Sequence, residues 1–421
     1  MKLFFESKQL VINSKEKSIL FNRNSAGSVE YAILDNLYEP VDGFQLYKDN
    51  VLKYSIDIDS MDRVHLVALM KSGELNYSIL ENGNWSNAII AKFDLHSKIY
   101  SDIILLTEEN NINIIYGYAN LINSKLWTIQ HVIGKNQNWD QYSIAKFISD
   151  KNMASYIVDR DSLGNIQLIY SSMEGFTSQV YHTFYNIYAN KWNPIPNKLS
   201  SSNIKKVLPY IFLDTKDNIH SLWLEDSNNN YILKYSRFSS AGENKFTWNQ
   251  VKVPYIASCT NHPIIYEEKG ILKIIYTKPG SIGYIYSPDY GHTWHEGEDF
   301  KTDFSNINLI KISNCTFNSN SKINHVYCSI GKKLNFIFFD SFNSNDTESL
   351  KSKDEKDKSI MEEDTSEKTE IMIKELLKNQ ETINTLILKT IESQQKVEKD
   401  IEYILELLMN KKSSLFDKIF K

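Results

Sequence analysis

This chain of 421 residues has few of the residues that build covalent, metal or membrane frameworks. Its three cysteines, Cys259, Cys315 and Cys328, are odd in number and form no CxxC pair. We therefore expect buried, reduced thiols rather than a disulfide framework or a zinc knuckle. No run of about 18 apolar residues occurs, so no transmembrane segment is predicted.

The N-terminal segment MKLFFESKQLVIN has too short an apolar core for a signal peptide. A cytoplasmic location is the simplest expectation, with association to a surface or spore layer left open. Arginine is also scarce, with Arg23, Arg63, Arg160 and Arg237 the whole set. This scarcity limits any mechanism that needs clustered guanidinium groups.

The 47 basic residues are mostly lysine and face 52 acidic residues, which gives a net charge of −5. No strong basic field exists, so a nucleic-acid partner is not expected. A composition rich in Lys, Asn and Ile is typical of an AT-rich genome, such as that of a low-GC bacterium.

Aromatic residues are abundant, with 25 Tyr, 20 Phe and 7 Trp, and they recur along the chain. Apolar segments that follow a polar turn return about every 51 residues, and all but one of the clear copies contain an aromatic residue; a weaker copy lies near Phe21. The clearest copies are 63–70 (RVHLVALM), 111–118 (NINIIYGY), 165–172 (NIQLIYSS), 218–225 (NIHSLWLE), 271–278 (ILKIIYTK) and 322–329 (KINHVYCS). In five units a tryptophan opens a further strand: Trp85, Trp139, Trp192, Trp248 and Trp294.

Four short strands per repeat at this period predict an all-β fold, a seven-bladed β-propeller over residues 1–343. No helical pattern separates the strands, which argues against an α/β fold. The last unit, residues 305–343, has three strands and lacks the tryptophan. We expect residues 2–6 (KLFFE) to supply its fourth strand and close the ring. A six-bladed or open arrangement remains the alternative.

Residues 287–294 (SPDYGHTW) form the pattern S-x-D-x-G-x-T-W. In such a turn Asp289 can cap backbone amides, Gly291 can adopt a positive φ, and Ser287 and Thr293 can form local hydrogen bonds. Trp294 can pack between blades. The segment resembles the Asp box of sialidase-like (BNR-repeat) β-propellers. The resemblance implies a structural role for these residues and does not imply hydrolysis.

Sialidases of this superfamily also use an arginine triad, a Tyr–Glu nucleophile pair, an acid Asp and an Arg-Ile-Pro motif. This chain has no Arg-Ile-Pro, and its four arginines fall in four different repeats. We therefore predict no catalytic residue. Whether the chain is an enzyme stays open, with the expectation leaning to no, and a sialidase-like glycoside hydrolase is the alternative function.

Three groups of aspartates recur at the same hairpin turn of successive repeats: Asp57, Asp59 and Asp62; Asp159 and Asp161; and Asp214 and Asp217. They lack the further acidic residue of a calcium loop, so turn capping is the better interpretation. His65 and His220 occupy equivalent strand positions and are expected to be satisfied by their neighbours, with a channel-facing ligand or metal site as the alternative. We predict no metal and no cofactor.

The composition changes after residue 343. Residues 344–369 read as a charged flexible linker, residues 370–412 as a coiled-coil helix and residues 413–421 as a short amphipathic tail. A 3,4 spacing holds for about five heptads and favours a trimer or tetramer, with a lone helix docked on the propeller as the alternative. The layer positions are Ile373, Leu376, Gln380, Ile383, Ile387, Thr390, Gln394, Val397, Ile401, Ile404 and Leu408.

These patterns together indicate a binding or scaffold protein whose propeller is presented in several copies by the coiled coil. The expected partners are further copies of the same chain and either a glycan or a surface-layer protein. Fold does not decide the matter, because propellers host both binding and catalysis.

Overall fold

The computed structural model describes residues 8–108, 111–135, 138–149, 154–201, 203–228, 230–241, 245–314 and 321–339. The chain divides into two units, Met1–Glu348 and Ser349–Lys421, and all described residues belong to the first. The predicted strand at residues 2–6, the linker, the coiled-coil positions from Ile373 to Leu408, the terminal segment and Cys315 lie outside the described residues. Those predictions stay predictions.

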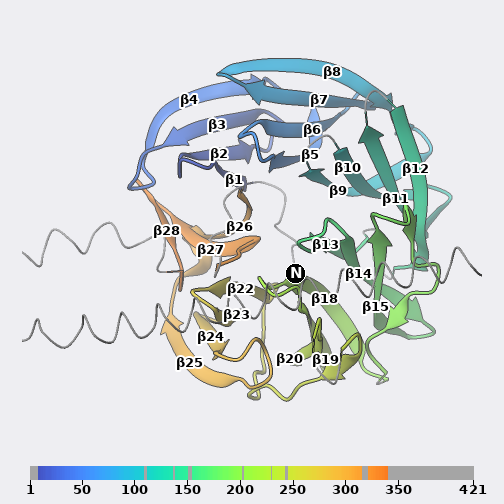
Figure 1. Ribbon diagram of the computed structural model, residues 1–421, viewed down its shortest axis with the longest axis vertical. Coiled ribbons are helices and arrows are strands. Elements are labelled where there is room, and N and C mark those ends of the chain that lie inside the picture. Colours follow the sequence, from blue (N-terminus) through green and yellow to red (C-terminus); the bar gives the residue numbers. More distant parts are fainter. Residues whose placement is uncertain are drawn as a thin grey trace, which may run out of the picture. The chain divides into compact units, whose positions relative to one another are not determined.

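The described residues fold as strands with one short 3₁₀ helix, η1 (Phe304–Asn306), which confirms the all-β class. Figure 1 shows the sheets arranged radially about a common centre, with the first strand of each unit innermost and the last outermost. This arrangement is that of a β-propeller.

Five of the six sheets follow chain order from the inner to the outer strand. They are β5 (Val51–Ile58), β6 (Val64–Met70), β7 (Glu74–Glu81) and β8 (Asn84–Lys92); β9 (Lys98–Glu108), β10 (Asn111–Asn120), β11 (Asn123–Lys135) and β12 (Asn138–Ile148); β13 (Tyr156–Arg160), β14 (Ile166–Glu174), β15 (Thr177–Asn186) and β16 (Lys191–Trp192), with β17 (Asn197–Lys198) also on β15; β18 (Lys205–Leu213), β19 (Ile219–Ser227), β20 (Asn230–Phe238) and β21 (Trp248–Gln250); and β22 (Ile264–Glu268), β23 (Ile271–Lys278), β24 (Ser281–Ser287) and β25 (His295–Lys301).

The sixth sheet has seven strands and contains both the first and the last described strands of the chain. Its order is β28 (Leu334–Phe336), β27 (His325–Ile330), β26 (Ile307–Asn314), β1 (Lys8–Ile12), β2 (Ser18–Arg23), β3 (Val29–Leu34) and β4 (Pro40–Tyr47). All its pairs are antiparallel except β1 with β26, which run parallel with Gln9 opposite Lys311. This pair joins the first and the last described parts of the chain. Because β1 and β26 pair with each other, neither strand has an unpaired edge at this point.

The first two strands of each unit hold most of its buried residues, because neighbouring sheets cover both of their faces. In β6 only Met70 is partly exposed, and in β19 the run from Ile219 to Leu224 is buried. The outer strand β25 is the opposite case, since all seven of its residues are exposed. The recurring apolar runs in the sequence are therefore these second strands, which lack alternation because both faces are dry.

Tryptophans from the outer part of one unit pack against the preceding unit. The ring centroids lie 5.9 Å apart for Trp85 and Tyr31, 5.6 Å for Trp192 and His131, 5.0 Å for Trp248 and His182, and 5.0 Å for Trp294 and Tyr235. Aromatic contacts of this kind stabilise beyond the area they bury.

Trp139 departs from this pattern, although the sequence places it at the same point of its repeat. Its side chain is 40% exposed, and a Cβ added at Gly134 of its own sheet would lie 2.7 Å from its ring. Gly134 is opposite Trp139 in the register of β11 and β12. The indole therefore lies over its own sheet, at a position that glycine leaves open.

Four turns between first and second strands share one side-chain cap. Oδ1 of the capping residue accepts the amides of the residues two and four positions later, and the residue three positions later has a φ between 58° and 85°. The capping residues are Asn13, Asp59, Asp161 and Asp214. This confirms the predicted turn-capping role of Asp59, Asp161 and Asp214.

The same prediction is wrong for Asp57 and Asp159, which lie two residues before the capping positions Asp59 and Asp161. Each accepts a backbone amide from the next unit instead, Thr107 N at 2.7 Å and Leu213 N at 2.7 Å. The prediction is also wrong for Asp62 and Asp217, whose side chains accept from the preceding unit, through Ser14 N and Ser162 N, both at 2.8 Å. These carboxylates are therefore links between blades.

Candidate ligand site

The turn between β24 and β25 contains the five residues of the S-x-D-x-G-x-T-W segment. Ser287 Oγ donates to Asp289 Oδ1 (2.7 Å) and accepts from Gly291 N (2.8 Å). Asp289 also accepts from the Thr293 amide (2.8 Å) and hydroxyl (2.6 Å). Burial raises the pKa of Asp289, but the bonds from Thr293 and Ser287 outweigh it and the net shift is downward. These contacts hold the turn itself together.

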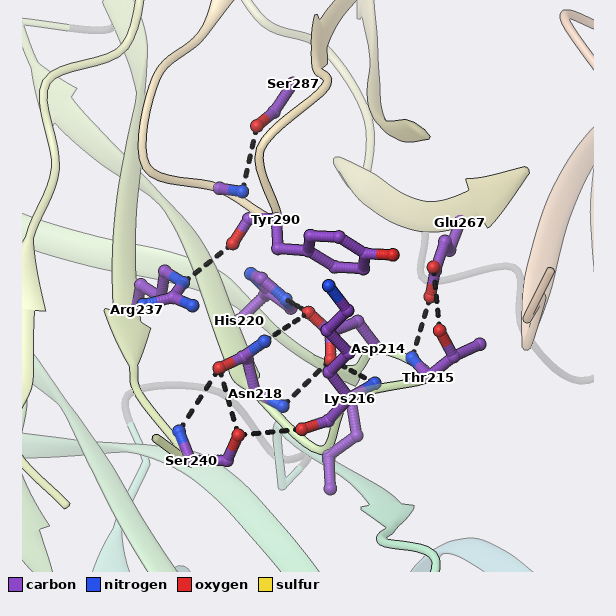
Figure 2. Close-up of polar contacts among 12 residues, drawn as sticks. Asp214, Thr215, Lys216, Asn218, His220, Arg237, Ser240, Glu267, Ser287 and Tyr290 are labelled. Carbon is purple, nitrogen blue, oxygen red and sulfur yellow. Dashed lines mark hydrogen bonds and ion pairs between the residues drawn. The ribbon is translucent and has the colours of Figure 1, made fainter. Parts of the chain in front are cut away.

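This turn also contacts the preceding unit, as Figure 2 shows. Arg237 Nε donates to the carbonyl oxygen of Tyr290 at 2.7 Å, and the Lys216 ammonium lies 3.6 Å from the centroid of the Tyr290 ring. Thr215 donates to Glu267 through its amide (2.7 Å) and hydroxyl (2.8 Å). These polar groups therefore bond to each other across the junction and join the two blades.

Substituting Gly291 with alanine is expected to lower the free energy of unfolding more than the same change at Gly280. Both residues have positive φ (85° and 73°), which costs a Cβ about 1–2 kcal/mol. At Gly291 the Cβ would also lie 2.1 Å from Tyr235 Oη, whereas nothing lies within 4 Å at Gly280. Overpacking adds about 1–3 kcal/mol. Urea unfolding of the two variants measures the difference, and equal losses would contradict it.

His65 and His220 are both satisfied by their neighbours. His220 Nδ1 lies 2.7 Å from Tyr235 Oη and its Nε2 lies 3.0 Å from Asp214 Oδ2. His65 repeats the arrangement with Tyr77 (2.6 Å) and Asp59 (3.0 Å). With both ring nitrogens engaged, neither histidine is placed to bind a ligand in the channel, which confirms the structural prediction. The sequence signal is the spacing D-x₅-H.

In the two units that follow the unit of His65, a different buried pair takes the place of His65 and Tyr77. His131 Nε2 lies 3.0 Å from Asn113 Oδ1, and His182 Nε2 lies 2.9 Å from Gln167 Oε1. His131 Nδ1 also accepts from Trp192 Nε1 of the following unit at 3.1 Å. Since Nδ1 is an acceptor, this contact requires the neutral ring with its proton on Nε2.

His131 is therefore expected to make the protein less stable in acid. Burial lowers its pKa from 6.5 to about 3, so as the pH falls the unfolded chain takes up the proton first. Stability is lost from pH 6.5 downward, by roughly 2 kcal/mol between pH 7 and pH 5 for this group alone. Chemical unfolding of wild type and His131→Gln at the two pH values tests this. The same pH dependence in both proteins would refute it.

A cavity of about 190 Å³ lies among the inner strands of the ring. Residues of β1, β5, β9, β13 and β26 line it, together with residues 321–325 and Phe339. Its lining combines apolar side chains, such as Tyr54, Ile104 and Ile157, with charged side chains. Largely apolar walls with a few convergent polar groups are typical of small-molecule sites.

Residues 321–325, which lead into β27, form one wall of this cavity by reaching across to other units. Lys322 pairs with Glu267 of β22 through two backbone bonds of 2.9 Å. Its ammonium donates to both Asp159 oxygens at 3.2 Å and to Arg160 O at 3.1 Å. His325 Nδ1 lies 2.9 Å from Tyr210 Oη of β18. One segment thus contacts three other sheets and fixes the size of the cavity.

Each of the three carboxylates that line the cavity already has a strong partner. Asp57 accepts from the amide and hydroxyl of Thr107, and Asp159 accepts from Leu213 N and from Lys322. Asp102 pairs with Lys53 at 3.2 Å. They hold blades together, and their arrangement is not that of an acid and a base waiting for a substrate.

The remaining cations of the cavity are Lys311 and Arg160. Lys311 Nζ donates to the carbonyl oxygen of Ile56 at 2.9 Å and to Ser55 Oγ at 3.3 Å, and Arg160 donates to the carbonyl oxygen of Thr107. All these acceptors are neutral. Burial lowers the pKa of Lys311, which the charge of Asp57 opposes and that of Arg160 reinforces.

Sequence reasoning missed these cavity residues. The four arginines do not form a cluster: Arg160 lines the cavity, while Arg23, Arg63 and Arg237 donate hydrogen bonds to Val51, Asp59 and Tyr290.

Among the described residues, no three His, Cys, Asp or Glu side chains are placed to hold a metal. Cys259 and Cys328 are buried and form no disulfide with a described residue. Within the described ranges no helix has the length and apolarity to cross a membrane.

No family model and no curated protein matches the sequence. Solved structures do match in fold. They include a fucose-specific lectin from Aleuria aurantia (10% identity, TM-score 0.41, covering 70% of this chain and 96% of the lectin) and the SapL1 lectin in complex with α-methyl fucoside (9%, 0.40, 70% and 96%). An α-L-arabinanase from Penicillium chrysogenum, complexed with arabinobiose, is similar to the same degree (11%, 0.40, 66% and 93%). Likeness at this level does not identify a ligand.

Proposed function

We propose that this chain is a non-enzymatic β-propeller that binds a small glycan in its central cavity and is presented in several copies by the heptad-bearing tail. The supporting observation is the cavity itself, whose walls combine apolar side chains with hydrogen-bonding groups. Its volume of about 190 Å³ is below the range of about 300–1,000 Å³ for drug-sized ligands, so it suits one sugar ring.

The state of the cavity carboxylates supports binding over hydrolysis. Glycoside hydrolysis needs one carboxyl group to give a proton and another to attack or to activate water. Asp57, Asp102 and Asp159 are held by Thr107, by Lys53, and by Leu213 and Lys322. A sialidase-like site would also bring several arginines into the cavity, and only Arg160 lines it.

We count the ring as seven blades as part of this proposal. The seven-stranded sheet contains two antiparallel runs, β1 to β4 and β26 to β28, that meet only through the parallel pair β1–β26. Each run has the strand order of a blade. On this count the S-x-D-x-G-x-T-W turn belongs to the sixth blade and serves as its structural Asp box.

A glycan array probed with the full chain, together with release assays on fluorogenic sialosides and aryl glycosides, tests the proposal. We expect binding without release of the aryl group. Steady hydrolysis would establish the enzyme alternative, and an array with no bound glycan would leave the scaffold function in its place.

Two variants locate the binding to the cavity. Ile104 is a partly exposed residue of the cavity wall, so Ile104→Trp should fill the space and abolish binding. Ile89→Trp is the matched control, because Ile89 is 63% exposed on the outer strand β8. Thermal unfolding shows that both variants fold. Binding that survives Ile104→Trp would place the ligand elsewhere on the propeller.

A further inference from the structure

The central cavity contains more positive than negative charge. The cations in its lining are Lys53, Arg160, Lys311 and Lys322, and the carboxylates are Asp57, Asp102 and Asp159. His325 adds no charge at neutral pH, because burial, with the charges of Lys311 and His262, lowers its pKa well below 6.5. Four cations against three carboxylates leave one positive charge in excess.

The excess positive charge can be assigned to particular side chains once the cations that form ion pairs are set aside. Lys53 pairs with Asp102 at 3.2 Å, and Lys322 pairs with Asp159 at 3.2 Å. Lys311 and Arg160 remain, and neither lies within 4.0 Å of a described carboxylate. Asp57, whose negative charge acts on Lys311, is the one carboxylate left between them.

Lys311 is held in place rather than left to move. Its backbone lies in β26, where it is paired with Gln9 of β1, and its ammonium bridges to Ile56 O and Ser55 Oγ of β5. These acceptors are neutral, so they orient the ammonium without neutralising it. A cation in a partly dry cavity gains from a charge-assisted bond with an anion.

We infer that the central cavity takes a small molecule bearing a single carboxylate, with the Lys311 ammonium as the carboxylate's counter-ion and Arg160 as its second cation. The inferred carboxylate site rests on the proposed function in one respect only, namely that the carboxylate belongs to a sugar. A free monocarboxylic acid has the same chemistry and is the other source. A neutral sugar would leave the Lys311 charge uncompensated and should bind more weakly.

Calorimetric titration of the full chain with D-glucuronate and with D-glucose tests this, because the two differ only at one carbon, which is a carboxylate in the first. L-lactate serves as the free acid. We expect the dissociation constant for glucuronate to be at least about tenfold lower than for glucose, as for a charge-assisted bond. If lactate binds and neither sugar does, the anion site stands and the glycan function fails.

Lys311→Met should remove the preference for glucuronate, and Lys311→Arg should keep most of it. Lys234→Met is the control, since Lys234 lies outside the cavity with a side chain 43% exposed and pairs with Glu225. Unfolding curves verify that each variant folds. No binding of any of the three probes, equal binding of glucose and glucuronate, or a preference that survives Lys311→Met would overturn the inference.

Discussion

Replacing Asp214 with alanine should lower the free energy of unfolding by about 3–5 kcal/mol, the cost of removing one partner of a buried charged network. Its Oδ1 caps the amides of Lys216 and Asn218 at 2.9 Å, and its Oδ2 accepts from Asn218 Nδ2 (2.8 Å) and faces His220 Nε2 (3.0 Å). The side chains of Asp214 and His220 are fully buried. Figure 2 shows that this carboxylate lies at the centre of the junction between two blades.

Asp214→Asn is the matched control, because its amide oxygen keeps an acceptor for the turn amides, while its NH₂ group replaces the charged oxygen that accepts from Asn218 Nδ2 and faces His220 Nε2. We expect it to cost less than half as much. Asp289→Ala is a second comparison, since Asp289 caps a turn at the surface, where losing a cap costs about 1 kcal/mol. Urea unfolding at pH 7 measures all three. A loss below about 1 kcal/mol for Asp214→Ala would show that the network adds little to stability.

The pKa of Asp214 sets the pH below which this network loses its contribution to stability. Burial raises it, but the hydrogen bond and charge of His220 and the bonds from Asn218 outweigh this, so the net shift is downward. A carboxylate with a lowered pKa stabilises the fold above its unfolded pKa, and that contribution is lost as the pH falls through the folded value. The effect therefore appears below about pH 4, whereas the loss of stability due to His131 begins near pH 6.5.

The sequence predicted best those features that recur in every unit. The second strand packs against sheets on both faces, so an apolar run such as 66–69 marks it in most units. Turn caps were predicted for the same reason, since Asp59, Asp161 and Asp214 bind amides only two and four residues away. The packing of Trp294 between blades follows from the same local spacing, whereas Trp139 lies over its own sheet because Gly134 leaves room there.

The cavity could not be predicted because contacts between distant residues build it. Lys322 reaches Asp159 and Lys311 reaches Ser55, partners 163 and 256 positions apart in the chain. Neither lysine stands out by spacing or motif. The parallel pair β1–β26 is likewise a meeting of two ends, and no local pattern distinguishes it from an ordinary antiparallel edge.

The second large effect we expect is on assembly. Substituting Ile387 and Ile401 with aspartate in the full chain should convert a trimer or tetramer into a monomer, because each change places a charge in a predicted apolar layer. Lys396→Asp is the control, since Lys396 lies in the heptad between them and falls outside its a and d positions, Gln394 and Val397. Light scattering measures the mass of each protein. A wild-type monomer would contradict the coiled coil and favour the lone docked helix.

On the proposed function, assembly also sets how strongly the propeller is expected to hold a glycan-coated surface. A cavity that admits one sugar ring offers few contacts, so a single propeller is expected to bind weakly. Joining three or four copies makes later contacts intramolecular and raises the apparent affinity for a glycan-coated surface by about 10²–10⁴-fold. The aspartate double variant should lose this gain on a coated surface while its calorimetric affinity for the free ligand stays unchanged. An equal loss in both measurements would mean that the tail acts on the cavity itself rather than through the number of copies.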